Sequence, residues 1–167
     1  MARLLALKPR WVLALFVFMD TICVGMGMGV PIFCILFGFV VGWYTVRRLA
    51  VAKADLPRML DRVFFYAVVT AAYTFVVMAA LWGPMAKRLF DPGADLANFG
   101  IPLILYDPRA SFIGWLVLMI AISPFLQLLT TLFAAHVTLL RWLRSAAERP
   151  AIGQAGLRSA AERPGRS

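Results

Sequence analysis

A single carboxylate, Asp20, interrupts the apolar N-terminal part of the chain and is the residue best suited to chemistry. No other charged residue occurs between positions 11 and 46. If this stretch is helical, Asp20 lies ~14 Å along the helix axis from Trp11, close to the midplane of a bilayer. A carboxylate at that depth costs ~2.5–3.5 kcal/mol on insertion scales. We therefore expect Asp20 to face the protein interior and to find polar partners there.

Hydroxyl and amide side chains occur at the same expected depth in two later apolar stretches. Tyr73 and Thr74 follow Thr70 by three and four residues, so they share one face of a helix with it. No lysine, arginine or histidine lies at this depth to neutralise the carboxylate. The sequence therefore predicts an intramembrane polar cluster of Asp20, Thr70, Tyr73, Thr74, Gln127, Thr130 and Thr131.

This cluster has two interpretations. It is either an interhelical hydrogen-bond network, worth ~0.6 kcal/mol per contact, or part of a path for protons or cations, because intramembrane carboxylates are often functional. His136 does not extend the path, because it lies half a turn away from the Gln127 face and close to Arg141.

Other kinds of chemistry have no support in the sequence. It contains no carboxylate pair, Ser/His/Asp set, phosphate loop, zinc spacing or haem attachment motif. Cys23 and Cys34 lie in apolar sequence and fit small packing side chains. With Met19, Met26 and Met28 they offer soft ligands for Cu(I), but their spacing matches no motif. We expect neither an enzyme nor a bound metal or other cofactor.

The elements that position these residues are apolar helices. Of the 167 residues, 62% are apolar, against about 45–50% in a soluble domain. Residues 63–82 and 110–140 contain no charged residue, and ~20 such residues match the hydrocarbon thickness of a bilayer. The composition predicts an all-α integral membrane protein.

Residues 11–46 are too long for one span and break in the middle. Three glycines and Pro31 fall between positions 25 and 31, where they disfavour a helix interior. We expect helices at 11–25 and 30–46, joined as a short glycine-rich hairpin. A re-entrant loop is the alternative. A cleaved signal peptide at residues 1–25 is disfavoured, because no small-x-small cleavage site follows the apolar run.

Basic residues favour an even number of passes. With four passes and the N-terminus inside, 14 of the 17 basic residues are cytoplasmic, whereas three passes leave 11. The positive-inside rule therefore predicts a four-helix transmembrane bundle of 11–25, 30–46, 63–82 and 110–140 in the inner membrane, with both termini cytoplasmic. The net charge is +9, and the basic residues responsible for it flank the apolar runs. We therefore expect the bilayer and its anionic lipid headgroups as partners, and no nucleic acid.

Two further features concern packing and the C-terminus. Gly38 and Gly42 form a GxxxG pair that lets two helices approach closely, within this chain or between two copies. The membrane domain is expected to occupy residues 1–142. Residues 143–167 are basic and repeat the segment LRSAAERP, and their composition predicts a disordered tail.

The sequence thus favours a small polytopic membrane protein that is a structural or accessory subunit of a membrane assembly, as a homo-oligomer or within a larger complex. The alternative is a small proton- or cation-coupled transporter or channel that uses Asp20.

Overall fold

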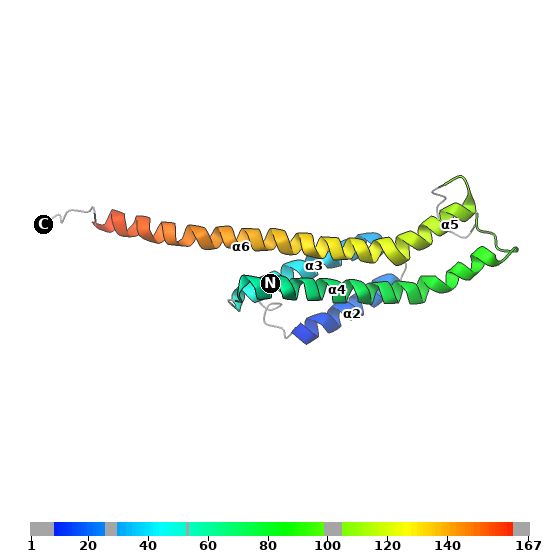
Figure 1. Cartoon of the computed structure of the whole chain (residues 1–167), viewed down its shortest axis with the longest axis horizontal. Helices are drawn as coiled ribbons and strands as arrows, with labels where there is room; N and C mark the ends of the chain where they lie inside the picture. The colour runs from blue at the N-terminus through cyan, green and yellow to red at the C-terminus, as the bar shows by residue number, and fades with distance from the viewer. Residues whose placement is uncertain (1–8, 26–29, 53, 99–104, 162–167) are drawn as a thin grey trace.

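The computed structural model describes residues 9–25, 30–52, 54–98 and 105–161, and all regular structure within these ranges is helical (Figure 1). The predicted all-helical class is therefore confirmed. The elements are α2 (Pro9–Gly25), α3 (Val30–Val51), α4 (Leu56–Trp82) with its 3-10 continuation η1 (Gly83–Phe90), α5 (Pro108–Val117), the π-helical turn η2 (Leu118–Ile122) and α6 (Ser123–Ala161).

Three helical stretches of the described residues are long and apolar enough to cross a membrane. They are Ile32–Val51, Leu56–Phe90 and Pro108–Ala146. Their outward faces carry large apolar side chains: Phe64 and Phe133 expose 60% and 59% of their surfaces. Contiguous apolar surface of this kind is unusual on a water-soluble monomer and ordinary in lipid. The chain is a helical membrane protein.

The first two helices end and begin where the glycines and proline predict. α2 ends at Gly25 and α3 begins at Val30. The glycine-rich hairpin tip predicted between them lies outside the described residues.

α4 begins earlier than the charge-free run predicts. Asp55 is extended, Pro57 lies in the first turn, and the Met59 amide donates to the Asp55 carbonyl oxygen at 3.0 Å. Proline suits a first turn because its missing N–H has no helical acceptor there. The helix thus includes the exposed Arg58 and Arg62, which precede the charge-free run 63–82.

The last long apolar run is divided by a π-helical turn. Asp107 caps α5 by accepting a hydrogen bond from the Arg109 amide at 3.0 Å. η2 then precedes Ser123 and Pro124, and the Ser123 hydroxyl donates to the Leu118 carbonyl oxygen at 2.7 Å. Pro124 cannot donate to a helical carbonyl, and the wider turn accommodates this loss. Figure 1 shows the resulting change of direction between α5 and α6.

α6 continues past residue 143 to Ala161, so its backbone is helical over most of the segment for which composition predicts disorder. Figure 1 shows this end of the helix projecting beyond the other helices. The segment LRSAAERP is rich in alanine, arginine and glutamate, which are good helix formers. These residue types favour the helix, whereas Pro150 and Gly153 in the same stretch oppose it.

Two apolar clusters hold the helices together at different levels. The Cys34 cluster consists of the buried residues Val24, Cys34, Met78 and Met119. The Met59 cluster consists of Val46, Met59, Val63, Ala135 and Leu139. α3 packs mainly along α6, while α2 contacts both α3 and α4.

The closest helix contact is between α3 and α6 at the two predicted packing glycines. A Cβ on Gly38 would overlap the Thr130 hydroxyl and lie 2.7 Å from the Gln127 carbonyl oxygen. A Cβ on Gly42 would overlap the Thr131 carbonyl oxygen and lie 2.9 Å from the Ala135 nitrogen. The partner of this GxxxG pair is therefore α6 of the same chain.

We predict that Gly42→Ala will destabilise the protein by ~1–3 kcal/mol, because the added methyl group meets backbone atoms that cannot rotate away. Reversible unfolding in detergent, followed by circular dichroism, measures this loss. Gly114→Ala is the matched control, since a Cβ there meets nothing within 4 Å. Equal stability of the two variants would contradict close packing at Gly42.

Candidate functional site: a buried polar layer

Buried polar side chains lie between the two apolar clusters on the long helices. On α4, Thr70 and Thr74 fall between Val63 of the Met59 cluster and Met78 of the Cys34 cluster. On α2, Asp20 lies one turn before Val24.

α6 also carries buried polar side chains between the two clusters, in the interval from Met119 to Ala135. Buried polar residues recur there at four-residue spacing, on one helix face. We call the whole set the polar layer; it consists of Asp20, Thr70, Thr74, Ser123, Gln127 and Thr131.

Asp20 is almost fully buried, with 1% of its surface exposed, and it joins α2 to α4. The Thr74 hydroxyl donates to Asp20 Oδ2 at 3.1 Å. The same hydroxyl lies 3.1 Å from the Thr70 carbonyl oxygen, so its one proton is shared between two acceptors. The contact is therefore a single, divided hydrogen bond across the helix interface.

Tyr73 lies beside the polar layer and makes a second link between α2 and α4. Its hydroxyl is 2.7 Å from the Thr21 hydroxyl. Because Thr21 donates to the Val17 carbonyl oxygen at 2.7 Å, the Tyr73 phenol is the donor in this pair. Sequence reasoning missed Thr21, since it neighbours Asp20 in the chain and belongs to a different, exposed helix face.

The remaining predicted threonines bond to their own helices. Thr70 donates to the Tyr66 carbonyl oxygen at 2.8 Å, Thr131 to that of Gln127 at 2.7 Å, and Thr130 to that of Leu126 at 2.9 Å. Such bonds to the preceding turn are common for threonine in helices. These hydroxyls therefore do not converge on Asp20.

Gln127 has hydrogen-bonding capacity that the described residues leave unused. Its side chain is fully buried, and neither amide atom has a hydrogen-bond partner among those residues. Burying an amide without a partner costs ~1–3 kcal/mol. The other polar groups of the layer are hydrogen-bonded, so a ligand or a bound partner that supplied hydrogen bonds would stabilise Gln127 most.

The charge of the layer comes from Asp20. The buried polar side chains of the described residues include no basic group. His136 is exposed on α6. Within the described part of the chain, no group of three or more histidine, cysteine, aspartate or glutamate residues is arranged to hold a metal ion. What the layer can do chemically is bind a proton or a small cation, or hold helices together.

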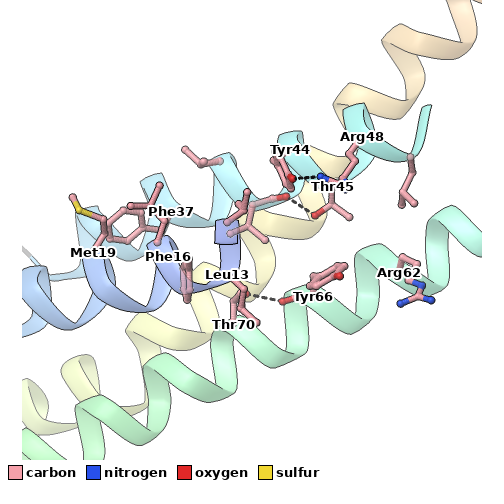
Figure 2. Close-up of a pocket in the computed structure, with 15 residues that line it drawn as sticks. Leu13, Phe16, Met19, Phe37, Tyr44, Thr45, Arg48, Arg62, Tyr66 and Thr70 are labelled. Carbon is pink, nitrogen blue, oxygen red and sulfur yellow. Dashed lines mark hydrogen bonds between the residues drawn. The ribbon is translucent and has the colours of Figure 1, made fainter. Parts of the chain in front are cut away.

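A second feature adjoins the layer: a cavity of about 470 Å³ between α2, α3 and α4. Figure 2 shows Phe16 and Met19 near one end of it, and Arg48 and Arg62 at the other. Thr70 belongs to both the polar layer and the cavity wall. This cavity is not predictable from the sequence pattern, because its walls come from three helices.

No known protein family, curated protein or solved structure matches the chain.

We predict that Thr74→Val will lower the free energy of unfolding by ~1–3 kcal/mol, because it removes the hydrogen-bond donor to a buried carboxylate without changing side-chain volume. Thermal unfolding in a mild detergent tests the loss. Thr138→Val is the matched control, since its hydroxyl bonds only to the Ala134 carbonyl oxygen of the same helix. If the two valine variants are equally stable, the Asp20–Thr74 bond contributes nothing to the fold.

Proposed function

We propose that the chain is a four-helix transmembrane bundle in which α2, α3, α4 and the continuous α5–η2–α6 each cross the bilayer. α2 has 17 residues and is ~26 Å long, which is close to a hydrocarbon core of ~30 Å. It also carries Asp20, whose burial suits a helix packed within a bundle and not one lying on its surface. Four passes leave both termini in the cytoplasm beside most of the basic residues, at the inner membrane.

The function we propose is that of a small structural or accessory subunit of a membrane assembly. The observation that carries this proposal is the Asp20–Thr74 hydrogen bond, enclosed between the Cys34 and Met59 clusters. A carboxylate whose bonded partner is a threonine of a neighbouring helix serves to fix the register of the helices. The exposed phenylalanines on the outward faces then supply surface for lipid, a second copy or a larger partner.

The second candidate is a small proton- or cation-coupled transporter or channel. It is favoured by the unpartnered amide of Gln127 in the same layer as the Asp20 carboxylate. A proton or cation that entered the layer would find the carboxylate and the amide oxygen. The Cys34 cluster, on the side of the layer away from the cavity, argues against a continuous path in this conformation.

Flux measurements on the purified protein in liposomes separate the two candidates. We expect no proton, sodium or potassium flux above that of empty liposomes under imposed gradients, because the Cys34 cluster closes the layer on the side away from the cavity. Flux that disappears in Asp20→Asn and persists in Asp61→Asn, an exposed aspartate on α4, would establish transport and overturn the subunit proposal. Co-purification from native membranes then identifies the assembly.

The four-pass topology has its own test. We expect a cysteine placed at Met28, in a background without Cys23 and Cys34, to react with an impermeant thiol reagent added from outside the cell. Two full spans put this position at the outer surface, because α2 and α3 then meet there. A cysteine at Arg47 is the control for the cytoplasmic side. If position 28 is labelled only when the reagent has access to the cytoplasmic side, residues 11–46 form a re-entrant loop and not two full spans.

A further inference from the structure

The cavity between α2, α3 and α4 has the shape and lining of a site for an apolar chain. Its volume of about 470 Å³ falls in the range of about 300–1,000 Å³ that is typical of ligand sites. Leu13, Phe16 and Met19 line it from α2, and Phe37 and Val41 line it from α3. Apolar walls of this kind favour a hydrocarbon occupant over a soluble ion or a polar peptide.

Positive charge is confined to one end of this cavity. Figure 2 shows Arg48 of α3 and Arg62 of α4 at the end opposite Met19. The Arg48 guanidinium is held beside the wall by Tyr44: its Nη1 donates to the Tyr44 hydroxyl at 2.7 Å, and its Cζ lies 6.0 Å from the centre of the Tyr44 ring. Within the described part of the chain, no acidic residue lines the cavity. Guanidinium groups are well suited to bind phosphate oxygens.

The length of the cavity matches one leaflet of a bilayer. From Phe37 to Arg48 along α3 is ~16 Å, about half of a ~30 Å hydrocarbon core. The deep end lies at Met19, next to Asp20 of the polar layer. A lipid whose headgroup sits at the arginines would therefore place its chain beside α2 as far as the middle of the membrane.

From this match of charge, lining and length, we propose that the cavity binds one phospholipid with an anionic headgroup. Its phosphate lies between Arg48 and Arg62, and one acyl chain fills the space between α2, α3 and α4. The assignment of this lipid to the inner leaflet rests on the proposed topology, in which these arginines are cytoplasmic. A lipid in this position would also strengthen the attachment of α2, because it packs against three helices at once.

The direct test uses the unmodified protein in nanodiscs. Phosphatidylglycerol with a photoreactive group at the end of one acyl chain is compared with phosphatidylcholine bearing the same chain. We expect phosphatidylglycerol to label peptides that contain Met19 or Phe37 several-fold more than phosphatidylcholine does, with no competition from free glycerol phosphate. Equal labelling by the two lipids, or labelling only at outward residues such as Phe133, would overturn the proposal. Competition by glycerol phosphate would mean that a soluble anion binds in place of the lipid.

Matched arginine variants test the headgroup contact. In Arg48→Gln/Arg62→Gln, we expect phosphatidylglycerol to be retained roughly thirtyfold more weakly in native mass spectrometry, because both charge-assisted hydrogen bonds to its phosphate are lost. Arg47→Gln/Arg58→Gln removes the same charge from exposed residues that do not line the cavity, and retention should change less than about twofold on the same scale. An equal loss in both pairs would assign the effect to general surface charge and overturn a specific site.

A cavity-filling variant tests the acyl-chain site even if the Arg48→Gln/Arg62→Gln protein does not fold. Leu13→Trp keeps both arginines and occupies the space of the acyl chain, so it should abolish the photolabelling of Phe37. Unchanged labelling of Phe37 would exclude the cavity as the chain site. The proposal can fail here while cysteine labelling at position 28 still supports the four-pass topology, so the two failures are distinguishable.

Discussion

A buried carboxylate in a hydrocarbon environment must find its partners within the protein, and this constraint governs the arrangement of α2. Neither lipid nor an apolar cluster can solvate Asp20, so α2 must turn that face towards α4, where Thr74 supplies a donor. Thr21 and Tyr73 add a second hydrogen bond across the same interface. Phe16 also packs edge-on against Phe37 of α3, with ring centres 5.9 Å apart. α2 is therefore held by a few polar and aromatic contacts together with Val24 in the Cys34 cluster.

The contact between α3 and α6 has a different physical basis. It relies on the absence of side chains at Gly38 and Gly42, which brings the backbones close enough for dispersion contacts over several turns. The junction of α2 with α3 and α4 is looser and leaves a cavity of about 470 Å³, while a second cavity of about 310 Å³ lies among α3, α4 and α6 near the Met59 cluster. α3 and α6 are thus a closely packed pair at these two glycines, and the larger of the two cavities lies where α2 joins its neighbours.

Sequence reasoning located the helices well because glycine, proline and charge act locally. The end of α2 and the start of α3 follow from the Gly25–Pro31 segment. The start of α4 was expected at residue 63 and lies at Leu56, because exposed arginines at a helix end are compatible with the helix. The π-helical turn before Ser123 depends on a backbone rearrangement that residue types alone do not specify.

The sequence by itself determined that the chain is helical, that it belongs in a membrane, and that Asp20 needs an interior partner. These conclusions depend on composition and on the solvation of single residues, which are properties of each segment alone. Only the tertiary structure decided that Thr74 is that partner, that Gln127 is left without one, and that the glycines face α6. It also brought Arg48 and Arg62 to one end of a shared cavity. Each of these results depends on the rotation of one helix against another, which is fixed by the packing of all the helices together.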